Sequence, residues 1–308
     1  MKLSRRKASS TIGIKALLAG SVAATLGCGG DTASIAATPR GGDTVSIVPP
    51  AREWVQVWSD EFDGAAGSRI DNTKWSYDLA DGCQVGICGW GNNEKEYYSD
   101  STDNIALNGQ GQLQIVARTA APGRSCYYGP CRYTSAKVTS RGKMLASPGR
   151  VEARIKLPGG QGLWPAFWML GHGSPATPWP DCGEIDIMEN KGSQLSTTSS
   201  ALHGPGYSGA TPFAHSFVLP TGKLADDFHT FAVEWDSVYV RWYVDDNPHY
   251  TVTRDEIQRY GSSVLNQSFF VILNLAVGGH FDGDPQSDTI FPATMLVDYV
   301  RVFALKPK

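Results

Sequence analysis

The 308-residue sequence predicts an all-β fold, a two-sheet antiparallel β-sandwich. Glycine (34 residues) and proline (18 residues) are frequent, and only 19 % of the residues are charged, which is typical of a chain rich in turns. This composition excludes a coiled coil and a long helical bundle, because both need many charged helix-forming residues. Apolar and polar residues alternate over short runs, and clusters of Gly, Asn, Asp and Pro separate the runs. Such alternation indicates antiparallel strands with one buried face.

The N-terminal segment, residues 1–27, is predicted to be a signal peptide rather than part of the fold. Residues 2–7 are basic, and the apolar run 16–27 is too short to span a bilayer. We therefore expect the protein to be exported. The run ends in Leu-Gly-Cys28, which resembles a bacterial lipoprotein cleavage site, although Thr25 stands where leucine is usual. Lipidation of Cys28 at the bacterial cell surface and simple secretion both remain open.

The rest of the chain is predicted to be a flexible tether, residues 28–50, followed by one domain, residues 51–308. The tether is rich in Gly, Ala, Thr, Ser and Pro. Outside the signal segment the chain carries 22 basic and 30 acidic residues, a formal net charge of -8. This acidic balance argues against nucleic acid or an anionic membrane surface as a partner.

Four cysteines form two closely spaced pairs, Cys83 with Cys88 and Cys126 with Cys131. In an exported protein this spacing predicts two local disulfides, and cross-pairing between the two loops stays open. A zinc site would need tighter pairs with histidine partners. Cys182 is left over, and we expect it to be a buried free thiol.

The strands follow in order along the domain. Residues 113–118, 230–235 and 238–244 are predicted strands, and the apolar run 269–275 is predicted to be a buried one. Only residues 253–260 look helical. Two further runs place alternate residues on one face: Val151, Ala153, Ile155 and Leu157 in the first, and Leu296, Asp298, Val300 and Val302 in the second.

The strongest chemical signal is the acidic segment 181–190, which reads DCGEIDIMEN. On a strand Glu184 and Asp186 share one face, while the isoleucines between and after them point into the core. Strict alternation would put Met188 beside these acids. A β-bulge, one extra residue, returns Glu189 to the acidic face. We therefore expect three carboxylates in a row on one sheet surface.

Three carboxylates so close cannot all ionise without cost, so at least one pKa should be raised. Glycoside hydrolysis needs this arrangement, with one ionised carboxylate as nucleophile and one protonated carboxyl as acid. Retention of configuration requires the two groups to be about 5–5.5 Å apart, which Glu184 and Glu189 could satisfy. The alternatives are a solvated acidic strand face and a calcium site, although calcium loops place their acids among glycines.

Two tryptophans precede the acidic segment by about twenty residues. Trp164 and Trp168 fall on the same strand face, where indole rings could bury the flat C–H faces of a sugar. The alternative is that both belong to the core. His203 could orient a carboxylate or the sugar.

Several ordered motifs together resemble glycoside hydrolase family 16, and within it the bacterial endo-1,3-β-glucanases, or laminarinases. The resemblance covers essentially the whole domain. It rests on the segments 58–63 (WSDEFD), 90–94 (WGNNE), 162–170 (GLWPAFWML), 183–190 (GEIDIMEN), 273–279 (LNLAVGG) and 297–302 (VDYVRV).

The resemblance implies a concanavalin A-like jelly roll with a concave cleft and a retaining mechanism that needs no cofactor. Glu184 would be the nucleophile and Glu189 the acid and then the base, while Asp186 would hydrogen-bond the nucleophile and hold the Glu189 proton. The substrate would be 1,3-β-glucan, with mixed-linkage 1,3-1,4-glucan as a further substrate that the resemblance allows. A galactan such as agarose or carrageenan, and a non-catalytic glucan-binding role, are the alternatives. We expect a monomer.

The resemblance also implies ligand-binding residues. Trp164, Trp168, Asn93, Arg141 and His203 match positions that line the family's cleft. A structural calcium ion would be held by backbone oxygens of Glu61 and Gly109 and by the Asp298 carboxylate; a hydrogen-bonded aspartate without calcium is the alternative. The two cysteine pairs are not general in the family.

Overall fold

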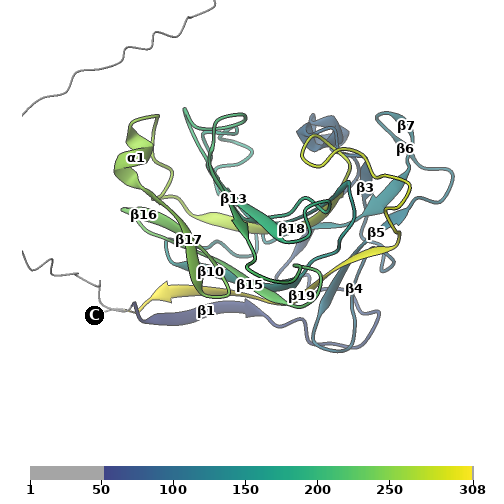
Figure 1. Ribbon diagram of the computed structural model, residues 1–308, viewed down its shortest axis with the longest axis horizontal. Coiled ribbons are helices and arrows are strands. Elements are labelled where there is room, and N and C mark those ends of the chain that lie inside the picture. Colours follow the sequence, from purple (N-terminus) through teal and green to yellow (C-terminus); the bar gives the residue numbers. More distant parts are fainter. Residues whose placement is uncertain (1–51, 307–308) are drawn as a thin grey trace, which may run out of the picture. The chain divides into compact units, whose positions relative to one another are not determined.

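The computed structural model describes residues 52–306. The predicted signal segment, the tether and Cys28 lie outside the described residues. Two β-sheets pack face to face, with the smaller sheet above the larger in the view of Figure 1. The predicted two-sheet antiparallel sandwich is confirmed. No helix among residues 52–306 is long and apolar enough to cross a membrane.

The larger sheet has ten strands, in the order β17-β16-β15-β10-β19-β5-β8-β3, with β1 paired to β19 and β4 paired to β5. All its pairs are antiparallel except that of β3 with β8. Its strands are β1 (Trp54–Asp60), β3 (Glu96–Tyr98), β4 (Ile105–Leu107), β5 (Leu113–Thr119), β8 (Tyr133–Ser135), β10 (Arg150–Lys156), β15 (His229–Trp235), β16 (Tyr239–Val244), β17 (Asn247–Thr253) and β19 (Ala293–Leu305).

The smaller sheet has seven strands, in the order β14-β13-β12-β11-β18-β9-β2. It contains the acidic segment as β12 and the tryptophan segment as β11. Its strands are β2 (Ser76–Asp78), β9 (Lys137–Thr139), β11 (Leu163–Gly171), β12 (Glu184–Glu189), β13 (Thr197–His203), β14 (Phe213–Val218) and β18 (Phe269–Val277). We call the side of this sheet that faces away from the core the active-site face.

Several short elements lie outside the two sheets. The hairpin β6 (Ser125–Cys126) and β7 (Gly129–Pro130) and the 3-10 helices Cys83–Val85 and Cys88–Gly91 carry the cysteine pairs. The predicted disulfides Cys83–Cys88 and Cys126–Cys131 are both formed, and Cys182 is a buried free thiol. The one α-helix among residues 52–306, α1 (Arg254–Gln258), is shorter than predicted. Its N-cap is Thr253, whose side chain and that of Glu256 form a capping box.

The core between the sheets is made by alternate residues of each strand. The alternate residues predicted to share one face of β10 and the position after it are all buried: Val151, Ala153, Ile155 and Leu157. The prediction for β19 is half wrong. Val300 and Val302 are buried, but on the preceding half of the strand Met295 and Val297 point inward instead of Leu296 and Asp298. A register shift between β10 and β19 at this point lets the strand change its phase.

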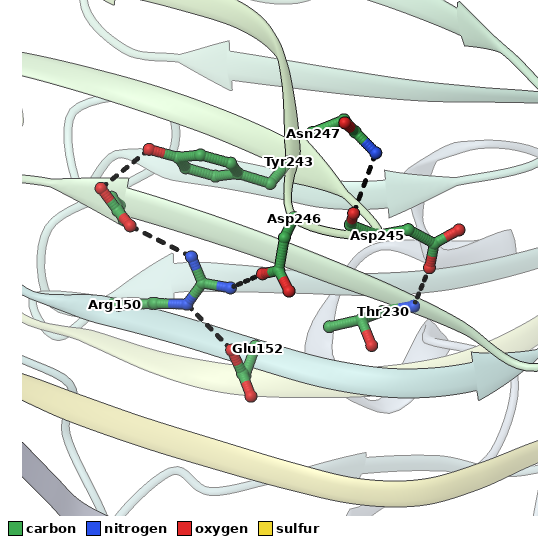
Figure 2. A network of polar contacts seen from close by, with 8 residues as sticks. Arg150, Glu152, Thr230, Tyr243, Asp245, Asp246 and Asn247 are labelled. Carbon is green, nitrogen blue, oxygen red and sulfur yellow. Dashed lines mark hydrogen bonds and ion pairs between the residues drawn. The ribbon is translucent and has the colours of Figure 1, made fainter. Parts of the chain in front are cut away.

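The outer side of the larger sheet is tied together by one buried arginine. The Arg150 guanidinium donates to Glu152 at 2.8 Å, to Glu234 at 3.0 Å and to Asp246 at 2.9 Å (Figure 2). The Tyr243 hydroxyl donates to the other oxygen of Glu234 at 2.9 Å. Because every N–H edge of the guanidinium meets a carboxylate, its charge is compensated although the side chain is nearly inaccessible.

Candidate active site

The acidic strand β12 carries the predicted bulge. Asp186 pairs with Ala201 of β13, and Glu189 pairs with Ser199. Between these two pairs β12 has one more residue than β13. A matching shift occurs against β11, where Trp168 faces Asp186 and Phe167 faces Met188. Ile187 and Met188 are therefore both buried in the core. The three carboxylates lie on the active-site face, as the sequence predicts.

The bulge frees backbone carbonyls from regular pairing, and side chains supply the missing donors. The Trp242 indole N–H donates to the Asp186 carbonyl oxygen at 2.9 Å, and the Ser200 hydroxyl donates to that of Ile187 at 2.9 Å. The Thr198 hydroxyl donates to the Glu189 carbonyl oxygen at 3.1 Å. Since Ser200 and Trp242 are fully buried, the extra residue is held by the core itself.

Cross-strand pairing lays out the active-site face in rows, because directly paired residues project on the same side of a sheet. The row that contains Glu189 continues through Ala166 of β11 and Asn274 of β18 to Lys137 of β9. The next row holds Asp186 and Trp168, and the third holds Glu184 with His203 and Leu170. The small side chains of Ala166 and Ala201 leave space beside the carboxylates.

Burial dominates the electrostatics of the three acids. It raises the pKa of Glu184, of Asp186 and of Glu189 to about 8 in each case. The charge of Asp186 raises the pKa of Glu184 and Glu189 further, whereas a charged His203 would lower both. The group therefore retains protons at neutral pH, and one carboxylate can serve as nucleophile while another is a proton donor.

His203 lies beside two of the acids. Its Nε2 is 3.2 Å from Asp186 Oδ2 and 3.7 Å from Glu184 Oε1. The ring thus lies in contact with the carboxylates, and its predicted role, to orient a carboxylate or the sugar, stays a prediction. The Trp179 ring lies 5.9 Å from it, centroid to centroid, and Trp179 is 47 % exposed.

Trp164 and Trp168 both lie half-buried on the active-site face. The Trp164 indole N–H donates to Glu189 Oε1 at 2.9 Å, and its ring stacks on Phe281 at 4.8 Å. The Trp168 indole N–H donates to Asn274 Oδ1 at 2.8 Å, and the Lys137 ammonium lies 5.0 Å from the ring centroid. Trp164 therefore bonds the predicted acid directly, and Trp168 does not.

Asn93 and Arg141 lie farther from the acids. Asn93 is exposed, and its Oδ1 accepts hydrogen bonds from Lys95 Nζ at 2.7 Å and from the Tyr127 hydroxyl at 2.8 Å. It is thus joined to the β6–β7 hairpin loop. The Arg141 guanidinium lies 4.8 Å from the Phe270 ring centroid, and Phe270 pairs with the Leu170 that faces Glu184. Arg141 is therefore on the active-site face, packed on β18, which is two strands from the β12 strand of Glu184.

Four residues of the site were missed by sequence reasoning: Trp179, Asn274, Lys137 and Glu94. Trp179 carries a signal that could have been used, since a tryptophan next to the acidic segment suits sugar binding. Asn274 and Lys137 carry no such signal, because their place beside Trp168 follows from the pairing of β9 and β18 with β11. Glu94, whose charge raises the pKa of Glu189, is the fourth carboxyl to act on the site.

The residues predicted to hold calcium do not form a cluster of acids. The Glu61 carboxylate is paired with Arg301 at 2.8 Å, and the Asp298 carboxylate is paired with Arg154 at 2.9 Å. The Glu61 carbonyl oxygen lies near Gly111, where an added Cβ would be 3.9 Å from it. Within residues 52–306 the only three His, Cys, Asp or Glu ligand atoms grouped closely enough for an ion belong to Glu184, Asp186 and His203.

Comparison with known proteins identifies the family. A model described as "Glycosyl hydrolases family 16" matches residues 90–299, a stretch that includes all three carboxylates. The chain belongs to glycosyl hydrolase family 16. The "Beta-glucanase" of Rhodothermus marinus is 39 % identical to this family 16 chain over 267 residues, which is 82 % of this chain and 86 % of that protein.

Solved structures agree with this family 16 assignment. The endo-β-1,3-glucanase of Pyrococcus furiosus is 41 % identical, with a TM-score of 0.79 over 83 % of this chain and 97 % of that one. The laminarinase catalytic domain of Thermotoga maritima is 42 % identical, with a TM-score of 0.78 over 83 % of this chain and all of that one. The chain is therefore a glycoside hydrolase with the family's jelly-roll fold.

The bulge supports a stability prediction with a matched control in this family 16 domain. Ser200→Ala removes the buried donor to the Ile187 carbonyl oxygen and should lower the free energy of unfolding by about 1–2 kcal/mol. Ser199→Ala, one residue earlier on the face away from the core, should change it by less than about 0.5 kcal/mol. Urea unfolding of both variants measures the difference, and equal effects would contradict the role of Ser200.

The Trp164 hydrogen bond supports a second prediction, on pH dependence. An N–H donor to a carboxylate stabilises the ionised form, so Trp164→Phe should raise the pKa of Glu189, by about one unit. Glu189 would then keep its proton to higher pH. The alkaline limb of the kcat/KM profile should move upward in Trp164→Phe. Trp168→Phe is the control, because its indole bonds Asn274, and an equal shift there would rule out the explanation.

Proposed function

We propose that this family 16 hydrolase is a retaining endo-1,3-β-glucanase that cleaves internal bonds of β-glucans such as laminarin. The observation that carries the proposal is the bulged β12, which presents Glu184 and Glu189 on one face with Trp164 bonded to Glu189. The similarity to the glucanase and laminarinase structures over the whole domain supports 1,3-β-glucan as the substrate.

The proposed mechanism has two displacement steps. In the first, the Glu184 carboxylate attacks the anomeric carbon while the Glu189 carboxyl gives its proton to the departing glycosidic oxygen. The bond to the leaving chain breaks and an ester to Glu184 forms. In the second, the Glu189 carboxylate takes a proton from water, whose oxygen displaces Glu184. Configuration is retained and both carboxyl groups are restored.

Asp186 and His203 support these two groups. Asp186 raises the pKa of both glutamates by its charge, which helps Glu189 to hold its proton. His203 lies 3.7 Å from Glu184, where a proton on its ring would stabilise the nucleophile's negative charge. The two neighbours therefore act on the glutamates in opposite directions.

A galactan substrate and a non-catalytic glucan-binding role are less well supported. A protein that only binds glucan has no need for the two glutamates or for the Trp164 contact that sets the protonation of Glu189. Activity on mixed-linkage 1,3-1,4-glucan is compatible with the same site, as a secondary activity.

The substrate is tested by measuring reducing sugar released by the purified domain from laminarin, lichenan and agarose in parallel. We expect rapid release of oligosaccharides from laminarin and slower release from lichenan. Release from agarose alone would preserve the mechanism and overturn the substrate. Binding of laminarin without any hydrolysis would favour the non-catalytic role.

The nucleophile is tested by Glu184→Gln. The variant should lose more than about 99 % of its turnover, because no carboxylate remains to form the ester, while laminarin binding measured by calorimetry should persist. Glu53→Gln changes an exposed glutamate directly before β1 and should keep full activity. More than a few per cent residual turnover in Glu184→Gln would refute the assignment.

We further propose a structural calcium ion at the Glu61 and Gly109 carbonyls and the Asp298 carboxylate. The Glu61 carbonyl oxygen lies near Gly111, two residues after Gly109. Arg154 contacts one carboxylate oxygen of Asp298, which leaves the second for an ion. Calcium should then raise the thermal unfolding midpoint, and Asp298→Asn should reduce the increase. An unchanged midpoint between calcium and EGTA would exclude the ion.

The basic and apolar pattern of residues 1–27 supports export, with Cys28 as a lipidation site. The N-terminal mass of the protein made in a bacterial host distinguishes a lipid-modified Cys28 from simple cleavage and from retention of the leader.

A further inference from the structure

A second group of acids lies beside the active-site face, and the mechanism does not use it. Glu96 and Tyr98 share one face of β3, and Glu94 lies two residues before that strand. All three are buried, with Glu96 1 % and Tyr98 0 % exposed. Burial raises the pKa of both glutamates, and that of Glu96 well above its usual value. Two buried glutamates two residues apart need an explanation.

A chain of hydrogen bonds joins Glu94 to Trp168. The Trp168 indole N–H donates to Asn274 Oδ1 at 2.8 Å, and Asn274 Nδ2 donates to the Tyr98 hydroxyl at 3.1 Å. The Tyr98 hydroxyl donates to Glu94 Oε2 at 3.2 Å. This chain connects a tryptophan of the active-site face to a carboxyl three hydrogen bonds away.

The direction of every bond in the chain is fixed. An indole N–H can only donate, so Asn274 must turn its oxygen to Trp168 and its NH2 group to Tyr98. The Tyr98 oxygen accepts that bond, and its own proton is left to point to Glu94. Glu94 Oε1 meets a further donor, the Asn92 side-chain amide at 3.1 Å. Glu94 thus accepts on both oxygens in this structure, as an ionised carboxylate does.

Glu96 completes the arrangement from the opposite side. Its Oε2 accepts the Val277 backbone N–H at 2.6 Å. Its Oε1 is buried and accepts no hydrogen bond from any donor in the part of the chain that the structure describes. Burial raises the pKa of both carboxyl groups most, and a side-chain hydrogen bond between them is among the further causes, lowering the pKa of Glu94 and raising that of Glu96. A proton on Glu96 Oε1 that is donated to Glu94 would satisfy the orphaned atom and remove the repulsion.

We propose that Glu96 is a buried carboxylic acid that donates to an ionised Glu94, and that Glu94 positions the Trp168 indole through Tyr98 and Asn274. The relay makes Glu94, Glu96, Tyr98 and Asn274 positioning residues for a sugar platform. This positioning role rests on the proposed function. The proton on Glu96 and the direction of the hydrogen bonds from Trp168 to Glu94 do not rest on it.

The charged and titratable groups around the pair agree with one negative charge. Lys137 of β9 lowers the pKa of Glu94, and its ammonium lies 4.2 Å from the Trp90 ring centroid and 5.0 Å from that of Trp168. Tyr98 of β3 is the other titratable group in contact, and Glu189 of β12 is reached by the Glu94 charge. Within the described residues, the Lys137 ammonium thus offsets the negative charge that the two carboxyl groups share.

The relay is tested by NMR of protein with 15N-labelled tryptophan, in which the Trp168 indole signal is identified by its loss in Trp168→Phe. Glu94→Gln places an NH2 group against surrounding donors, and Tyr98→Phe removes the middle of the chain, so both should move the Trp168 signal. Glu96→Gln keeps a donor at the same place and should leave that signal unmoved at neutral pH.

Raising the pH should then move the Trp168 signal in the wild type, as Glu96 loses its proton, and should not move it in Glu96→Gln. The other tryptophan signals and the thermal unfolding midpoint report whether each variant is folded. If Glu94→Gln does not fold, Tyr98→Phe alone tests the relay. A Glu96→Gln shift as large as that of Glu94→Gln would overturn the proposal, and so would an unmoved signal in both Glu94→Gln and Tyr98→Phe.

The positioning role has its own measurement. Glu94→Gln and Tyr98→Phe should raise KM for laminarin about tenfold, the effect of one lost charge-assisted hydrogen bond, with a smaller change in kcat. An unchanged KM beside a moved Trp168 signal would overturn the positioning role. Absence of any laminarin hydrolysis in the wild type would refute the proposed function, and the NMR result would still decide the relay.

Discussion

The active site depends on one backbone irregularity, the extra residue in β12. Side chains alternate on a strand, so Glu184, Asp186 and Glu189 can share a face only if the strand bulges between the second and the third. The bulge in turn needs donors for its carbonyl oxygens, and one of them, the Trp242 indole, comes from the opposite sheet. The catalytic acids are therefore aligned only when the two sheets have packed together.

The same packing sets the chemistry of the acids. Burial is the largest cause of the raised pKa of all three, and individual contacts then differentiate them. Trp164 donates to Glu189 and limits the rise, whereas His203 approaches Asp186 and Glu184. Because these contacts come from β11 and β13, the strands on either side of β12, the sheet order distributes the roles among chemically similar groups.

The sequence predicts the local features and misses those that depend on pairing between distant strands. Period-two reasoning places the three acids and both tryptophans on the correct face, because that information lies within single strands. It cannot place Lys137 beside Trp168, since β9 and β11 meet only through β18. The error at Leu296 has a similar origin: apolar residues occupy both phases of β19, so the pattern does not reveal where the strand shifts.

The two groups of acids on this sheet are coupled through charge. Burial raises the pKa of Glu189 most, and the negative charge of Glu94 raises it further, so an ionised Glu94 helps the catalytic acid to hold its proton. An ionised Glu94 is also what the bonds from Tyr98 and Asn92 require. If Glu96 lost its proton, its negative charge would act on Glu94 and on Glu189 at once. One buried proton on Glu96 thus links the orientation of the Trp168 platform to the protonation of the catalytic acid, although the two lie on different strands.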